Sequence, residues 1–177
     1  GPGNCLIDNW VRNNSKLQFD KNGEVASSSN INQIILNQAI DNIEIDIKQS
    51  LDISDFDISF ARGLSFEEGC ATISELTGYL ISKGIEKSIK SFHDKQVICV
   101  VCGGGRKNNF LINSIKKNIQ LSQDIIIKII DEFNMDGDFI ESQAFGYLAI
   151  RSYLNLPISF PKTTRCKKPV SGGIVVE

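Results

Sequence analysis

Three consecutive glycines, Gly103 to Gly105, are the residues of this sequence that point most directly to chemistry. They follow the apolar run Val97–Val101, which is typical of a short buried strand, and a helical pattern begins at about Asn108. Because glycine loses much chain entropy on folding, three together indicate a backbone with no room for side chains. A tight turn needs such a backbone, and so does a loop whose N–H groups bind a phosphate. Taken alone, the run does not decide between these two interpretations.

Two other patterns resemble metal or redox sites but fail on spacing. Cys99 and Cys102 match C-x-x-C, yet residues three apart on a strand point to opposite faces, so we expect both thiols to pack in the core. In the acidic stretch that begins at Asp131, Glu132 and Gln143 would occupy the first and last positions of an EF-hand loop. The loop requires Asp and Glu at those positions, so the template fails. The sequence therefore predicts no metal site.

The remaining charged residues carry weaker signals. Glu141 lies in the first turn of a helix expected over 138–154, where the helix dipole favours a carboxylate. It would also suit a ligand cleft at the end of a sheet. His93 is the only histidine and has no sequence partners for a catalytic triad. A basic cluster is expected to be solvated surface: Lys162, Arg165, Lys167 and Lys168.

The composition is that of a single globular domain. The chain has 177 residues, of which 41% are hydrophobic and 23% charged, enough for one real core. A net charge of −2 gives no electrostatic case for nucleic acid or an anionic membrane as a partner. No apolar run approaches the roughly 20 residues of a membrane helix, and no signal peptide is recognised. Five scattered cysteines suit reduced thiols and a cytoplasmic location.

The elements that must position these residues indicate an α/β fold. Strand, glycine turn, helix and strand over 97–130 form a βαβ unit, which implies two parallel strands. Helices are also expected over 4–12 with Asn4 as cap, after Ser27–Asn30, from a Ser65-x-x-Glu68 capping box to Phe92, and over 138–154. The last of these would bury Ile140, Ala144, Phe145 and Leu148. Residues 48–62 are expected to be a loop, Pro157 and Pro161 to exclude further helix, and 171–177 to supply a short strand.

Eleven short stretches, in order along nearly the whole chain, carry a family resemblance. They are Gly1-Pro-Gly-Asn4, Leu6–Trp10, Phe19-Asp20, Ala71–Thr77, Val101–Gly105, Asn108, Asp136–Asp138, Glu141–Ala149, Leu156-Pro157, Thr163-Thr164 and Gly172-Gly173. Most are weak individually, but the ordered set is specific. Together they resemble the anhydro-N-acetylmuramic acid kinases, part of the actin-like, sugar-kinase and Hsp70 ATPase superfamily.

The resemblance implies a cell-wall recycling enzyme. Such kinases use ATP, Mg²⁺ and water to open 1,6-anhydro-N-acetylmuramic acid and phosphorylate it to N-acetylmuramic acid 6-phosphate. The implied fold is a ribonuclease H-like (actin-like ATPase) domain, a mixed sheet with flanking helices that is incomplete at its N-terminus. Residues 1–177 would form a single domain, the C-terminal half of a two-domain clamp. Its implied partners are ATP, the sugar, and the N-terminal half of the kinase, and the family also suggests a homodimer.

Site residues follow from the same resemblance. The nucleotide-binding residues would be Gly103, Gly104, Gly105 and Asn108, on the adenosine side. A second phosphate loop would comprise Gly1, Gly3 and Asn4. Glu141 would contact the sugar. The resemblance assigns no catalytic base to this chain: the expected Asp lies just before Gly1, and the N-terminal glycine-rich loop with its metal-binding Asp also lies outside it.

The sequence departs from the family pattern in places. Where the family usually has Pro-Lys-Ser, the 48–53 loop reads Lys48-Gln-Ser-Leu-Asp-Ile53, which puts its substrate contacts in doubt. Asn134 and Arg165 stand where glycine is common. These departures leave an alternative hypothesis, a non-catalytic α/β nucleotide-binding or interaction module from a split or decayed kinase gene.

Overall fold

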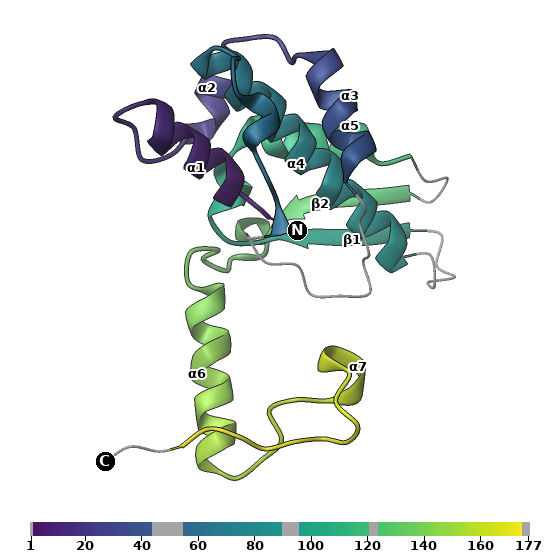
Figure 1. Ribbon diagram of the computed structural model, residues 1–177. Helices are drawn as coiled ribbons and strands as arrows, with labels where there is room; N and C mark the ends of the chain where they lie inside the picture. Colours follow the sequence, from purple (N-terminus) through teal and green to yellow (C-terminus); the bar gives the residue numbers. More distant parts are fainter. Residues whose placement is uncertain (1, 44–54, 90–95, 121–123, 175–177) are drawn as a thin grey trace.

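The computed structural model describes residues 2–43, 55–89, 96–120 and 124–174 (Figure 1). Its helices are α1 (Cys5–Asn14), α2 (Glu24–Ser27), α3 (Gln33–Asn42), α4 (Phe66–Ile89), α5 (Asn109–Asn118), α6 (Ile140–Tyr153) and α7 (Pro161–Thr164). Its strands are β1 (Gln96–Val101) and β2 (Asp124–Ile129). Short 3₁₀ turns lie at Lys21–Gly23, Ser59–Ala61, Gly104–Lys107 and Ile130–Phe133. Among the described helices none is long and apolar enough to cross a bilayer.

The βαβ unit is confirmed. Strands β1 and β2 pair in parallel from Gln96 opposite Asp124 to Val101 opposite Ile129, and α5 connects them. Helices α1 to α5 lie on one side of the strands in Figure 1, and on β1 the alternate residues Ile98 and Val100 are 50% and 41% exposed. The described residues contain no antiparallel strand of the expected mixed sheet, only one antiparallel bridge between Ser159 and Val170.

Helix α4 is the centre of the core, and two of its glycines are contact points. A Cβ at Gly69 would lie 2.2 Å from the Trp10 ring, and one at Gly78 would lie 2.1 Å from Ser114 Oγ. Helices α1 and α5 therefore approach the backbone of α4 closely, and Trp10 donates a hydrogen bond to Phe66 O at 2.9 Å. Glycine generally weakens a helix, but at these two positions it permits tight packing.

Several local predictions need correction. Helix α3 begins after Asn32, whose side chain accepts from Ile35 N at 3.1 Å, and not at Ser27–Asn30. The capping box that opens α4 is half formed, because Ser65 Oγ accepts from Glu68 N while the Glu68 carboxylate accepts from Asn32. Pro161 begins the short helix α7 instead of excluding helix, since proline at the first helical position loses no hydrogen bond.

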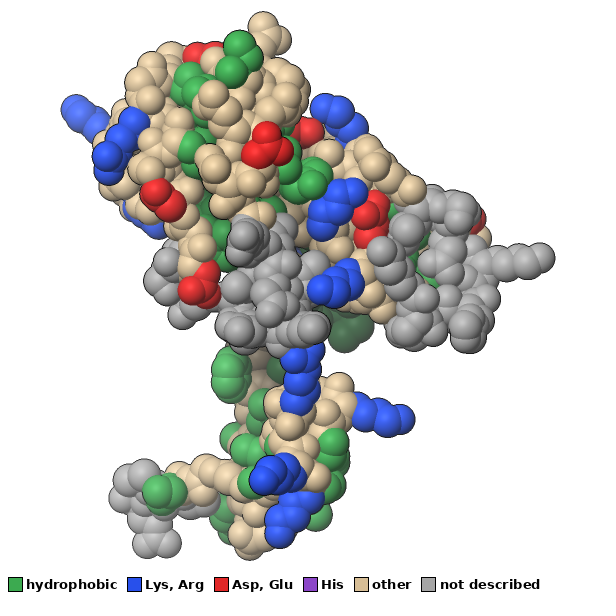
Figure 2. Space-filling model, turned by 45° about the vertical axis from the view of Figure 1, so that its right-hand side comes forward, with side chains coloured by type: hydrophobic (Ala, Val, Ile, Leu, Met, Phe, Trp, Pro, Cys, Tyr) green, Lys and Arg blue, Asp and Glu red, His purple; other side chains and the backbone are tan. Residues whose placement is uncertain are grey.

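Helix α6 exposes the face that was expected to be buried. None of its residues is buried, and Phe145 is 65% exposed. The helix extends away from helices α1 to α5 in Figure 1. Hydrophobic side chains gather on the arm that it forms with the residues after it, here called the C-terminal arm (139–174) (Figure 2). Apolar periodicity identifies a face that needs covering, but it does not say whether the same chain covers it.

Candidate functional site

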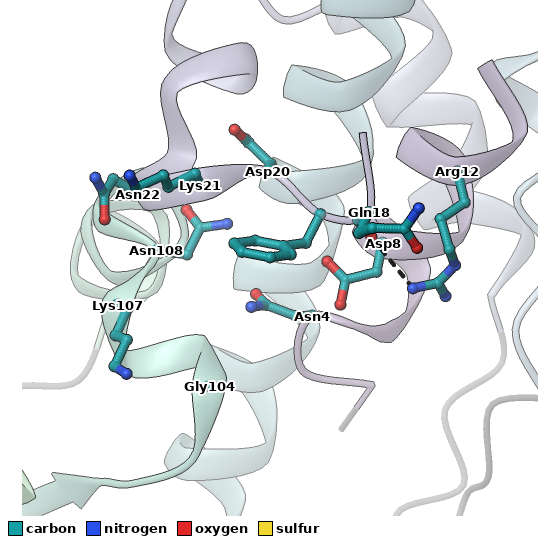
Figure 3. A pocket seen from close by; sticks show the side chains of 11 residues that line it. Asn4, Asp8, Arg12, Gln18, Asp20, Lys21, Asn22, Gly104, Lys107 and Asn108 are labelled. Carbon is teal, nitrogen blue, oxygen red and sulfur yellow. Dashed lines mark hydrogen bonds between the residues drawn. The ribbon is translucent and has the colours of Figure 1, made fainter. Parts of the chain in front are cut away.

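A cavity of about 490 Å³ lies between the glycine turn and the N-terminal helix (Figure 3). Three segments line it: one side of α1 with the residue before it, the segment between α1 and α2, and, from far along the sequence, the turn between β1 and α5. The lining residues are Asn4, Asp8, Arg12, Gln18, Phe19, Asp20, Lys21, Asn22, Gly104, Lys107 and Asn108. The fold thus brings Asn4 to Gly104 and Asn108, as the two loops of a phosphate site would require.

The glycine turn is fixed at its first residue and open at its second. Gly103 has φ +78°, a left-handed value that favours glycine, and its N–H donates to Gly137 O at 3.1 Å. Gly104 starts the 3₁₀ turn without a positive φ, and a Cβ there would meet no atom within 4 Å. Neither backbone geometry nor packing requires glycine at 104. Close approach of a ligand to the peptide would require it.

Asn108 ends the turn and caps α5. Its Oδ1 accepts from Leu111 N at 3.0 Å, so the side-chain orientation is set by the helix. The residue is 1% exposed, and its Nδ2 has no hydrogen-bond partner among the described residues. A buried N–H without an acceptor costs stability, so a ligand oxygen at this point would bind well.

Asn4 presents a second unpaired atom on the same cavity. It was expected to cap α1, but its side chain makes no capping bond, and the buried Oδ1 has no described partner. A Cβ at Gly105 would lie 3.7 Å from this oxygen, so the start of the chain and the glycine turn are close neighbours. Figure 3 shows Asn4 and Asn108 reaching the cavity from separate elements.

The charges around the cavity suit an anion. Three cations line it: Arg12, Lys21 and Lys107. Two carboxylates, Asp8 and Asp20, also line the cavity. Asp20 is already hydrogen-bonded, because it accepts from Val25 N at 2.8 Å and Ala26 N at 3.1 Å at the start of α2. Partial burial raises the pKa of Asp8, and nearby Arg12 opposes the rise. Lys107 Nζ already pairs with Asp138 Oδ2 at 2.6 Å, so phosphate oxygens would be favoured electrostatically mainly near Arg12 and Lys21.

Not every predicted site residue reaches this cavity. Glu141 is exposed in the first turn of α6 and does not line it. Gly3 lines a neighbouring groove of about 610 Å³ that runs along β1. Gly1, the 48–53 loop and His93 lie outside the described residues. The core prediction for the cysteines is wrong for Cys102, which follows the end of β1 and is exposed.

Sequence reasoning missed most of the polar lining. These residues are Asp8, Arg12, Gln18, Lys21, Asn22 and Lys107. Lys107 directly precedes Asn108 and follows the glycine run by two residues, so the sequence could have placed it at the site. Arg12 and Lys21 carried no such signal, because only the fold of the segment between α1 and α2 brings them to the turn.

Comparisons with known proteins match this sequence along nearly its whole length. The sequence model of the family described as "Anhydro-N-acetylmuramic acid kinase" matches residues 1–44 and 56–177. The chain belongs to this family. It is 51% identical over 180 aligned residues to the anhydro-N-acetylmuramic acid kinase of Pelagibacter ubique, covering all of this chain. Identity is 34% to the kinase of that name from Agrobacterium fabrum over 99% of the chain, and 32% to that from Zymomonas mobilis over 98%.

The chain spans only part of these relatives. It covers 48% of the Pelagibacter kinase and 46% of each of the other two. The family assignment therefore applies to this chain, while the activity of a protein twice as long requires a separate argument.

Proposed function

We propose that this chain is the C-terminal half of an anhydro-N-acetylmuramic acid kinase and holds the nucleotide. The observation that carries the proposal is the unpaired Nδ2 of Asn108 beside Gly104, in a cavity lined by three cations. An ATP oxygen would accept from this amide, and the nucleotide would lie along the open side of Gly104. The phosphate loop would comprise Gly1, Gly3 and Asn4, of which Asn4 lies close to the same turn.

The chemical role of the chain is binding and orientation. Phosphoryl transfer depends mainly on positioning and on electrostatic stabilisation of the transferred group. Arg12, Lys21 and Lys107 fit the charge of ATP, whose γ-phosphoryl group is the one transferred, with Mg²⁺ neutralising its phosphates. Of the carboxylates that line the cavity, Asp20 is already bonded to two backbone N–H groups. The base that activates water to open the anhydro ring would come from outside this chain, as the family resemblance implies.

The N-terminal half would complete the enzyme. The curated relatives are about twice as long as this chain, and the C-terminal arm exposes an apolar surface. Its large exposed side chains include Phe139, Phe145, Ile150, Tyr153 and Leu154. Covering them with the other half would bring Glu141, at the start of α6, to a cleft where it could contact the sugar. The whole would have the two-domain ribonuclease H-like fold, with residues 1–177 as one domain.

The first test is nucleotide binding by this chain. Calorimetric titration with MgATP should show binding, and Gly104→Val should weaken it by about tenfold or more, equivalent to about 1.4 kcal/mol, because the side chain fills the ligand's path. Gly84→Val is the matched control, since a Cβ at Gly84 also meets nothing within 4 Å but lies on α4 away from the cavity. Equal weakening by both variants would argue against a site at the turn.

The second test is reconstitution of activity. The separately expressed N-terminal half of the kinase is added to this chain with MgATP and 1,6-anhydro-N-acetylmuramic acid, and ADP release is followed. Release that needs both halves and the sugar is expected. If the halves associate and MgATP binds but no sugar-dependent ADP appears, the chain is a binding module without kinase activity.

A further inference from the structure

Arg106 is a buried cation within the glycine turn, and no motif of the sequence pointed to it. Its side chain is only 4% exposed, although it carries a full charge. A buried guanidinium is costly unless its donors are satisfied by acceptors. The partners of Arg106 are therefore informative about what the residue does.

Those partners are the acidic loop that follows β2 (residues 131–138). Arg106 donates to both carboxylate oxygens of Asp131, from Nε at 2.6 Å and from Nη2 at 3.0 Å. Its Nη1 donates to Asp138 at 2.7 Å, and Asp136 lies 4.0 Å from Nη2. The stretch considered for calcium is thus neutralised in part by an arginine. The bidentate geometry fixes direction as well as distance, because guanidinium and carboxylate are both planar.

The same residue also holds the turn itself. Arg106 Nη1 donates to Gly103 O at 3.0 Å, while Gly103 N donates to Gly137 O at 3.1 Å. Both backbone groups of Gly103 are thus engaged, one by Arg106 and one by the loop that Arg106 binds. Because β1 and β2 are parallel, the turn and the acidic loop leave the same edge of the sheet, where a side chain can join them.

We propose that Arg106 is a positioning residue for the nucleotide. It locks the acidic loop against Gly103, and this lock sets the path of the Gly104 peptide, which runs towards Asn108 at the start of α5. The inference rests on the proposed function, since the ligand is the nucleotide of that site. Arg106 also links the glycine turn to the proposed sugar contact, Glu141. Its partner Asp138 lies two residues before α6 and three before Glu141.

Gly137 provides an independent way to disturb the lock. A Cβ at this position would lie 2.3 Å from Arg106 Nε and 2.6 Å from Cζ, so an alanine must displace the guanidinium. The Gly137 backbone has no positive φ, so alanine introduces no backbone strain of its own. Gly137→Ala should therefore reproduce the loss of Arg106 without changing any residue of the glycine turn.

The experiment measures MgATP affinity by calorimetry for five variants of the full chain. Arg106→Ala and Gly137→Ala should each raise the Kd about tenfold, within the range of couplings between contacting residues. Arg106→Lys, which keeps the charge but cannot bind two carboxylates in this geometry, should recover little. The double variant Arg106→Ala, Gly137→Ala should be no worse than either single variant, because no guanidinium remains to be displaced. Lys128→Ala, which removes the Lys128–Glu132 ion pair of 3.5 Å nearby, is the matched control.

Two further measurements separate positioning from general instability. Amide hydrogen exchange at Gly103 should accelerate in Arg106→Ala, while the amides of α4 keep their protection. In the reconstituted kinase, the KM for ATP should rise more than kcat falls. Unchanged MgATP affinity in Arg106→Ala, or additive effects in the double variant, would overturn the inference. If the unmodified chain binds no MgATP even with its N-terminal half, the proposed function fails as well, and the Gly103 exchange rates still show whether the lock exists.

Discussion

Asn108 performs two tasks with two atoms of one side chain, and substitutions can separate them. Its Oδ1 caps α5 by accepting from Leu111 N at 3.0 Å, and its unpaired Nδ2 is the proposed nucleotide donor. Asn108→Ser keeps a good capping oxygen and removes the amide nitrogen. Asn108→Ala removes both. If the two roles are separate, the two variants should differ in stability and agree in their binding defect.

The magnitudes follow from the contacts. Loss of an N-cap costs about 1 kcal/mol, so Asn108→Ala should melt about 2–4 °C below the unmodified chain, with Asn108→Ser in between. A hydrogen bond to a charged group contributes about 1.5–3 kcal/mol, so either variant should weaken MgATP binding by about 10- to 150-fold.

The assays are thermal unfolding by circular dichroism without nucleotide and calorimetric titration with MgATP. Unaltered MgATP affinity in Asn108→Ser would refute the role of Nδ2. An Asn108→Ser chain that melts as low as Asn108→Ala would show that the cap is not the relevant contribution to stability.

Two more predictions concern the fold. Gly78→Ala places a Cβ 2.1 Å from Ser114 Oγ and should destabilise the chain by about 1–3 kcal/mol in urea unfolding, whereas Gly84→Ala, with no atom within 4 Å, should stabilise it by up to about 1 kcal/mol. A larger loss for Gly84→Ala than for Gly78→Ala would contradict the packing of α4 on α5. The second prediction is that the contacts of Arg106 with the acidic loop weaken in acid. Arg106 and then Lys107 hold the pKa of Asp138 at about 2, below its usual value, so this stabilisation is present above about pH 4 and is lost as pH falls towards 2. Arg106→Ala should therefore show a smaller loss of unfolding free energy between pH 4 and 2, and no such difference would count against the lock.

Local patterns in the sequence were enough to predict the βαβ unit. The apolar run before Gly103, the helical pattern from about Asn108 and the spacing to β2 all act within about 35 residues, where chain geometry leaves few alternatives. The long helix α4 was recognisable for the same reason. These elements position the turn, so its place at the carboxyl end of β1 could be predicted without a structure.

Contacts between distant segments could not be predicted in this way. Asn4 reads as an ordinary helix cap, and only the packing of α1 on α4 brings it to Gly105. Arg106 reads as a surface cation of a loop, and its burial depends on three aspartates more than 20 residues away. The apolar face of α6 was identified correctly as a pattern, but its burial depends on a surface that the described part of this chain does not provide.

The two interpretations of the glycine run apply to different glycines. Gly103 is a turn glycine, because its φ of +78° and its two backbone hydrogen bonds account for it without a ligand. At Gly105 a Cβ would meet Asn4 and Leu111 at 3.7–3.8 Å, which is ordinary van der Waals contact, so packing there does not demand glycine. Gly104 has neither a positive φ nor a neighbour within 4 Å of a Cβ, and it lines the cavity with Asn108. A turn held rigidly on one side and open on the other is what a nucleotide loop needs, since the backbone is ordered before the ligand arrives.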